Sequence, residues 1–279
     1  TLFTFSCEIY SPLTKQDASA IGKVYAYEML GTIIGGILWT YFFIPRLHAF
    51  QTASLLVILN LLICAVLLAH KIRQRAFSLS FLSVISLGLF AAFTLVFMGG
   101  AQKLHELSVK TQWRGQNVIH YQNSIYGNIC VVENRGQYTF FTDGIAGIIT
   151  PVPDIEFAEE FTHIPLVSHP DPKRILIISG GAGGIINEVL KHPSVELVAY
   201  SELDPLLLEL MKKFPTPLTD YELNDPRVRI NHVDGRLFLK TTREKYDLVM
   251  VGLSDPSDLQ TNRFFTKEFF QLAKKKLSD

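Results

Sequence analysis

The chain has 279 residues with 26 basic and 26 acidic side chains, so its formal net charge is zero, and 48% of its residues are hydrophobic. A neutral chain lacks the basic surface that nucleic-acid binding requires, which excludes nucleic acid as the expected partner. Its three cysteines lie far apart and no Cys or His cluster has ligand spacing. The sequence therefore predicts neither a metal site nor a disulfide framework.

Long apolar runs are concentrated in the first hundred residues. Residues 52–69 and 79–98 contain no charged side chain, and each run is long enough to cross the hydrocarbon core of a bilayer. Residues 29–44 form a third such run, in which Gly31 and Gly35 suit close helix packing. Buried helices of a soluble protein are the alternative, but two such runs in succession argue against them. We therefore expect residues 1–100 to form transmembrane helices, with the lipid bilayer and other membrane helices or subunits as partners.

The charges that flank these runs leave the orientation open. Lys71, Arg73 and Arg75 place the loop between the second and third helices in the cytoplasm, which would put the rest of the chain outside. Lys103 and Lys110 favour the opposite arrangement. The chain starts without a methionine and ends shortly after a helix-like run from residue 266, so we expect an internal piece of a longer protein.

Residues 101–150 are expected to form a small β-rich part. Two strand-like runs, residues 128–133 and 137–142, flank Asn134, Arg135 and Gly136, a composition that predicts a hairpin turn. A further strand is expected at residues 145–150, after Asp143 and Gly144.

Strands and helices alternate in residues 151–279. Strands are predicted at 174–178, 195–200, 228–232 and 246–251, and helices at 185–192, 206–214 and 236–241. Such alternation predicts a parallel sheet with right-handed crossovers. The expected fold class is α/β, a Rossmann-like doubly wound sheet behind the β-hairpin part and the transmembrane helices.

The first predicted strand of this sheet ends in a glycine-rich turn that contains Gly180, Gly181, Gly183 and Gly184. Glycines let a ligand approach the backbone, and the helix that begins near Ile185 should point its free N–H groups at the same gap. Glu202 ends the next strand, where it could accept hydrogen bonds from a ribose, and Asp234 and Gly235 follow the third. Close packing alone could also explain the glycines, but three strand ends at one edge favour a nucleoside site.

These motifs resemble the spermidine synthases, the polyamine aminopropyltransferases, in order and spacing from about residue 124 to the end. The resemblance is carried by residues 124–129, 142–144, 163–166, 180–184, 188–192, 202–204, 225–228, 234–235 and 254–256. Residues 21–46 and 262–266 resemble a membrane-fused bacterial branch, which implies a bacterial inner membrane as the location. The resemblance further implies that Glu202 holds the ribose of decarboxylated S-adenosylmethionine or its thioether product, and that Asp234 binds the adenine amino group.

The resemblance also indicates that the amine-binding half of the pocket has diverged. Only a neutral amine can attack the sulfonium, and roughly one amine in a thousand is neutral at pH 7, so the family uses an Asp to remove the proton. That position is Gly252 here, and other polar positions of the family correspond to Ala158, Ala182 and Gly147. Asp255 remains as a candidate catalytic acid, although an Asp before a proline also suits a structural turn.

Whether the chain is an enzyme therefore stays open at this point. We expect a membrane-anchored spermidine synthase-like protein that binds an S-adenosyl-type nucleoside and forms little or no spermidine. The alternatives are a non-catalytic structural subunit of a membrane complex, that is, a pseudoenzyme, and an active polyamine aminopropyltransferase.

Overall fold

The computed structural model describes residues 3–4, 6–7, 17–72, 79–253, 256 and 259–278. Contacts divide the chain into two compact units, Thr1–Gln112 and Trp113–Asp279. The division expected at residue 100 lies later, after helix α5 (Gly100–Gln112), because this helix packs against helices of the first unit.

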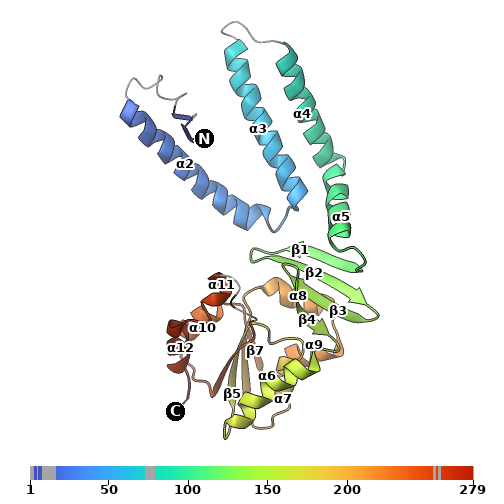
Figure 1. The fold of residues 1–279 in the computed structure, drawn as a ribbon, viewed down its shortest axis with the longest axis vertical. Coiled ribbons are helices and arrows are strands. Elements are labelled where there is room, and N and C mark those ends of the chain that lie inside the picture. Colours follow the sequence, from blue (N-terminus) through green and yellow to red (C-terminus); the bar gives the residue numbers. More distant parts are fainter. Residues whose placement is uncertain are drawn as a thin grey trace. The chain divides into compact units, whose positions relative to one another are not determined.

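The described part of the first unit consists of helices joined by short turns. Helix α2 (Asp17–Leu38) continues directly into a short π-helix, η1 (Trp39–Phe43), and is followed by α3 (Ala49–Ile72) and α4 (Leu79–Phe97) (Figure 1). Helices α3 and α4 pack side by side, and Gly88 lets them approach, since a Cβ there would lie 3.2 Å from the Leu61 side chain. The predicted apolar runs all lie in these helices.

Length and hydropathy single out α3 among the described helices. Its segment Ala49–Val66 has a mean hydropathy of 2.1 and is long enough to cross a membrane, with 6% of it buried within the protein. A second candidate arises if Ser83–Leu95 and Gly100–Gln112, which are bent by 64°, are taken as one span. The predicted run at residues 29–44 does not meet this criterion by itself, and insertion of all three runs in a bilayer stays a prediction.

The second unit begins with a four-stranded antiparallel sheet. Its strands are β1 (Val118–Asn123), β2 (Asn128–Asn134), β3 (Gln137–Thr142) and β4 (Ile145–Thr150), in sequence order. The predicted hairpin is confirmed, because Asn134 pairs with Gln137 and both Arg135 and Gly136 have the positive φ of a tight turn. Strand β1 was not predicted, since its sequence shows no regular alternation of polar and apolar residues.

A second sheet of four parallel strands follows. These are β5 (Arg174–Ile178), β6 (Leu197–Ser201), β7 (Val228–Asn231) and β8 (Leu248–Val251), in the order β7-β6-β5-β8. Successive side chains of β5 enter two different cores. Ile175 and Ile177 pack on one face of the sheet, and Leu176 and Ile178 pack on the other. The predicted parallel sheet is confirmed.

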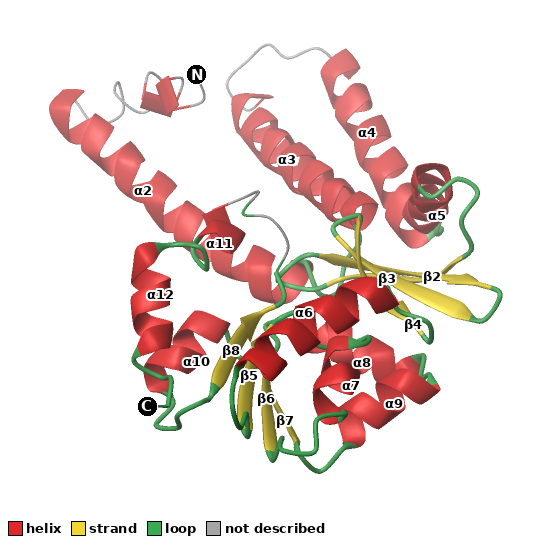
Figure 2. Cartoon of the chain, turned by 60° about the horizontal axis from the view of Figure 1, so that its bottom comes forward, coloured by secondary structure: helices red, strands yellow, loops and turns green. Residues whose placement is uncertain are grey.

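Helices cover both faces of this sheet (Figure 2). One face carries α6 (Ile155–Ser168), α7 (Ile185–Leu190), α8 (Pro205–Lys213) and α9 (Pro217–Asn224). The other carries α10 (Gly235–Thr241) and α12 (Lys267–Lys274), and the short α11 (Leu259–Asn262) precedes α12. Helices α6 and α9 were not predicted. The fold is thus a doubly wound α/β sheet of the Rossmann-like class.

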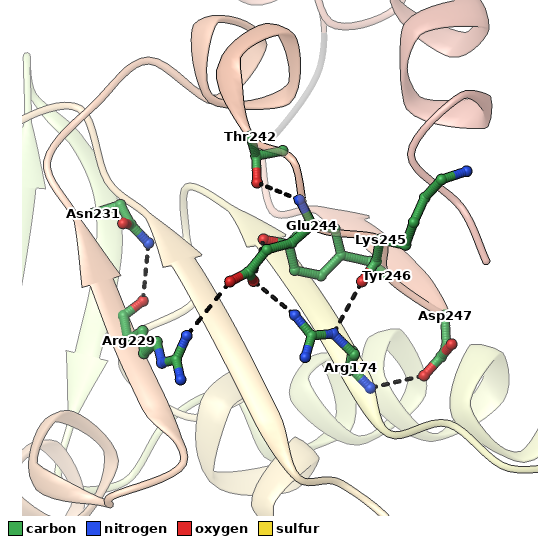
Figure 3. Close-up of polar contacts among 8 residues, drawn as sticks. All are labelled: Arg174, Arg229, Asn231, Thr242, Glu244, Lys245, Tyr246 and Asp247. Carbon is green, nitrogen blue, oxygen red and sulfur yellow. Dashed lines mark hydrogen bonds and ion pairs between the residues drawn. The ribbon is translucent and has the colours of Figure 1, made fainter.

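Charged side chains join the amino ends of the strands (Figure 3). The Arg174 guanidinium lies 2.7 Å from a Glu244 carboxylate oxygen, and Arg229 lies 3.5 Å from the other oxygen. Asp247 accepts hydrogen bonds from the backbone N–H groups of Lys173 and Arg174, at 2.9 and 2.8 Å. These contacts fix the start of β5 against the segment that leads into β8, at the edge opposite the predicted nucleoside site.

Candidate functional site

Three predicted site segments lie at the carboxyl ends of neighbouring parallel strands. The glycine turn at residues 180–184 follows β5, Glu202 follows β6, and Asp234 follows β7 as the N-cap of α10. Because β5, β6 and β7 are adjacent, all three segments reach the same edge of the sheet. This edge is where ligands bind in open α/β sheets.

Close backbone approach accounts for the glycines of the turn. A Cβ on Gly180 would overlap the carbonyl oxygen of Gly252, and a Cβ on Gly183 would lie 2.6 Å from the Ile148 side chain of β4. Both glycines also have positive φ angles, +63° and +87°, which L side chains rarely adopt. The turn is therefore packed against both β4 and the end of β8, and its contact with a ligand stays a prediction.

The N–H groups at the start of α7 are not free. Glu222 of α9 accepts hydrogen bonds from the backbone N–H groups of Gly183, Gly184 and Asn187, at 2.7, 2.7 and 3.0 Å. For these three N–H groups, the expectation that they are free to bind a ligand is wrong, because the buried carboxylate of Glu222 already accepts their hydrogen bonds. Burial raises the pKa of Glu222 to about 7, against the opposing effect of the three N–H donors.

Glu202 is a buried carboxylate held in a fixed position. The Tyr200 hydroxyl donates to its Oε2 at 2.8 Å, and the backbone N–H of Asp204 lies 3.4 Å from its Oε1. Burial raises the pKa of Glu202, and the Tyr200 hydrogen bond partly offsets that rise. Tyr200 also has a hydrogen bond with the backbone of Ala182, so one phenol connects the glycine turn to Glu202.

Asp204 connects this carboxylate to the antiparallel sheet. Its Oδ1 accepts from the N–H of Leu206 at 3.0 Å as the N-cap of α8, and its Oδ2 accepts from the Ser124 hydroxyl at 2.6 Å. Burial raises the pKa of Asp204, and these two hydrogen bonds act in the opposite direction. The loop that follows β1 and the loop that follows β6 are thereby fixed to each other.

Asp234 has two partners within the protein. Its Oδ1 accepts from the N–H of Leu237 at 2.9 Å, and its Oδ2 forms an ion pair with the Arg263 guanidinium. Gly235, the other predicted residue here, is close to β5, since a Cβ on it would overlap the Ile178 side chain. An adenine amino group bound to Asp234 would therefore share the carboxylate with Arg263.

Three of the four diverged positions lie in or near the turn. Ala182 and Ala158 are buried, and Gly252 is close to the turn because a Cβ on it would overlap the carbonyl oxygen of Ser179. Gly147 lies in β4, where a Cβ would have only the Phe140 carbonyl oxygen nearby, at 3.9 Å. Asp255, the candidate catalytic acid, lies outside the described residues, and its role stays a prediction.

A second polar cluster connects α6 to α7. His163 is hydrogen-bonded to His192 at 2.8 Å and to Glu188 at 3.1 Å, and Lys191 lies 2.6 Å from Glu188. These side chains satisfy one another, which indicates a structural role. Within the part of the chain that the structure describes, no group of three or more His, Cys, Asp or Glu side chains could hold a metal ion.

Sequence reasoning missed Tyr200 and Glu222. A signal for Tyr200 was present, since a strand residue two positions before Glu202 shares its face of the sheet. Glu222 gave no such signal, because α9 itself was not predicted and an acid in a polar segment is ordinarily exposed.

Comparison with known proteins agrees with this architecture. Residues 155–279 match the model of the spermine/spermidine synthase domain. The chain is 35% identical over 196 residues to spermidine synthase 2 of Hyoscyamus niger. The aligned region covers 69% of this chain and 59% of that protein. It is 29% identical over 261 residues to polyamine aminopropyltransferase 2 of Aquifex aeolicus, covering 93% of this chain and 51% of that protein. The chain thus spans between half and three fifths of the length of these relatives.

A solved structure shows the same relationship. A spermidine synthase in complex with the transition-state analogue AdoDATO superposes with a TM-score of 0.51 at 33% identity, covering 58% of this chain and 55% of that one. Sequence motifs, domain match and fold agree, and residues 155–279 form a domain of the spermine/spermidine synthase family.

Proposed function

We propose that this chain is a membrane-anchored spermidine synthase-like protein whose α/β domain binds an S-adenosyl-type nucleoside. The ligand would be decarboxylated S-adenosylmethionine or the thioether nucleoside that remains after aminopropyl transfer. The observation that carries this proposal is the buried carboxylate of Glu202, fixed by Tyr200 at the carboxyl edge of the sheet.

The geometry of Glu202 suits the two hydroxyl groups of a ribose. An ionised carboxylate has about four lone-pair directions, and the protein partners of Glu202 leave acceptor capacity on its oxygens. Both hydroxyls of a ribose are donors, so they complement a group that can only accept. A buried carboxylate without enough donors is costly, which favours the ligand that supplies them.

The amine side of the site supports weak or absent aminopropyl transfer. Gly252 stands where the family resemblance requires the proton-accepting Asp, and its backbone lies too close to the Ser179 carbonyl oxygen for a Cβ. Ala158 and Ala182 provide no polar atom to hold an ammonium group. A charged amine would therefore lose its hydration without replacement hydrogen bonds.

The helices of the first unit support the membrane anchor. Large apolar side chains such as Ile33, Leu59 and Phe90 are exposed on α2, α3 and α4, and α3 has the length and hydropathy of a span. The similarity to the Aquifex aeolicus aminopropyltransferase covers 93% of the chain and so includes most of this unit. A bacterial inner membrane would cover these side chains with lipid.

Calorimetric titration of the purified protein with methylthioadenosine and with decarboxylated S-adenosylmethionine tests the nucleoside proposal. We expect saturable binding of both, and we expect Glu202→Gln to abolish it while the protein stays folded. Spermidine formation from putrescine should be slight or absent in the same preparation. Lack of binding by the unaltered protein would favour a purely structural subunit instead, and robust turnover, near 10 per second, would identify an active aminopropyltransferase.

A further inference from the structure

Glu222 is a charged group that the proposed chemistry does not use, although it is completely buried. It lies in α9, whose N-terminus is fixed by a capping box between Thr216 and Thr219. Its Oε2 accepts from the N–H of Gly183, and its Oε1 accepts from the N–H groups of Gly184 and Asn187.

These three hydrogen bonds favour the ionised form of Glu222. An ionised carboxylate accepts N–H hydrogen bonds about twice as strongly as a neutral carboxyl group does. Protonation of Glu222 would therefore weaken its bonds to Gly183, Gly184 and Asn187 together. Gly183 and Gly184 have φ angles of +87° and +130°. Glycine can adopt many other backbone conformations as well, so the hydrogen bonds to Glu222 help to select this one.

The glycine turn is also connected to Glu202, the carboxylate proposed to bind the ribose. A Cβ on Gly181 would lie 3.0 Å from the Tyr200 ring, and the Tyr200 hydroxyl binds both Glu202 and the backbone of Ala182. A displacement of the turn would therefore move the phenol that orients Glu202.

We propose that Glu222 is a positioning residue of the nucleoside site, whose ionised carboxylate holds the glycine turn in its ligand-binding conformation. This inference rests on the proposed function and deepens it. Glu222 touches no ligand itself, and it acts through the turn and Tyr200.

The surroundings of Glu222 place its titration near neutral pH. Burial raises the pKa of Glu222 to about 7, and the negative charge of Glu188 on α7 adds to this rise. Tyr200 of β6 also interacts electrostatically with Glu222. The charged residues of the remaining elements packed on α9, namely Glu209, Lys212 and Lys213 of α8 and Arg229 of β7, are exposed. Nucleoside affinity should therefore fall as pH decreases through about 7.

The experiment uses the full chain in detergent and methylthioadenosine as the probe. If only the ionised form binds, the affinity of the unaltered protein should fall about tenfold between pH 8 and pH 6, given a pKa of about 7. Glu222→Gln should bind at least tenfold more weakly at pH 8 and lack this pH dependence. Thr219→Ala is the matched control, because it weakens the cap of the same helix but removes no hydrogen bond to the turn.

Amide hydrogen exchange of residues 180–187 gives a second measurement that needs no ligand. Glu222→Gln should accelerate exchange there, and Thr219→Ala should not. Unchanged exchange, or an affinity equal to that of the unaltered protein with the same pH profile, would overturn the role of Glu222. Lack of binding by the unaltered protein at every pH would instead overturn the proposed function itself. A pH-independent affinity of the unaltered protein between pH 6 and pH 8 would overturn the role of Glu222 even if Glu222→Gln fails to fold.

Discussion

Removing the single hydroxyl oxygen of Tyr200 tests whether this side chain positions Glu202 for ligand binding. Tyr200→Phe removes the hydroxyl that donates to Glu202 at 2.8 Å and leaves the ring in place. A hydrogen bond to a charged group contributes about 1.5 to 3 kcal/mol, so we expect methylthioadenosine affinity to fall by roughly tenfold to a hundredfold. Because that hydrogen bond lowers the pKa of Glu202, its removal should also raise that pKa further.

Calorimetric titration across pH 6 to 8 checks this prediction. Tyr246→Phe is a suitable control, since Tyr246 is equally buried but belongs to the core on the other face of the sheet. Equal losses of affinity in the two variants would indicate general destabilisation and would contradict a specific role for Tyr200.

Gly252 allows a test of whether the missing proton acceptor can be restored. We expect Gly252→Asp to destabilise the protein without producing spermidine, because its Cβ would overlap the carbonyl oxygen of Ser179. Overpacking of this kind costs about 1 to 3 kcal/mol. Thermal unfolding in detergent and a spermidine assay measure the two effects.

Gly147→Ala is the matched control for this change, because the nearest atom to its added Cβ is 3.9 Å away. It should unfold at nearly the temperature of the unaltered protein. A Gly252→Asp variant that is fully stable and forms spermidine would contradict this prediction. It would show that the backbone near Ser179 can shift to accept a side chain, and that glycine at position 252 is by itself the reason for the lack of activity.

Among the elements, one short hydrogen bond joins the loop after β1 to the N-cap of α8. Ser124→Ala removes the hydroxyl that donates to Asp204 at 2.6 Å and leaves one oxygen of a largely buried carboxylate without that donor. We expect a loss of about 1 to 3 kcal/mol in the free energy of unfolding. Denaturant titration measures it, and Ser168→Ala, which alters an exposed hydroxyl at the end of α6, should have little effect.

Sequence patterns predicted those elements whose buried faces are regular. Three of the parallel strands were found because β5, β6 and β8 are short, mainly apolar runs, and β7 was found from its alternation of apolar and polar residues. The hairpin was found because Arg135 and Gly136 suit its turn. Helix α6 was missed, and Pro165 lies within it, a residue usually read as a helix breaker. Helix α9 was missed although its capping box is local in sequence, because its buried Glu222 is stabilised by contacts distant in sequence.

The positions of the candidate site residues could be predicted from the order of the strands. Strand ends at one edge of a parallel sheet follow from topology alone, so the placement of the glycine turn, Glu202 and Asp234 could be inferred. The partners of these groups could not be inferred. Arg263 on Asp234 and Glu222 on the turn come from segments about thirty to forty residues away, as their hydrogen bonds show.

For the whole molecule, the apolar surface of the first unit determines where the protein should be found. Expressed in bacteria, the chain should remain with the membrane pellet after an alkaline carbonate wash and leave it only with detergent, if lipid covers the exposed apolar residues of α3 as we propose. Residues 113–279 expressed alone serve as the comparison and should be released by the wash. Recovery of the full chain in the supernatant would contradict membrane insertion.

The position of β5 between β6 and β8 also constrains how the chain can be synthesised. Ile175 pairs with Val198, but also with Leu248, which the ribosome adds 73 residues later than Ile175. At a translation rate of about 5 to 20 residues per second, β8 is synthesised roughly 4 to 15 s after β5, so one side of β5 has no strand to pair with during this time. During that interval its backbone N–H and C=O groups have no strand partner there, and Leu176 and Ile178 lack α12 on their face. Nascent chains should therefore be most prone to aggregation, and most dependent on chaperones, while residues 179–248 are being translated.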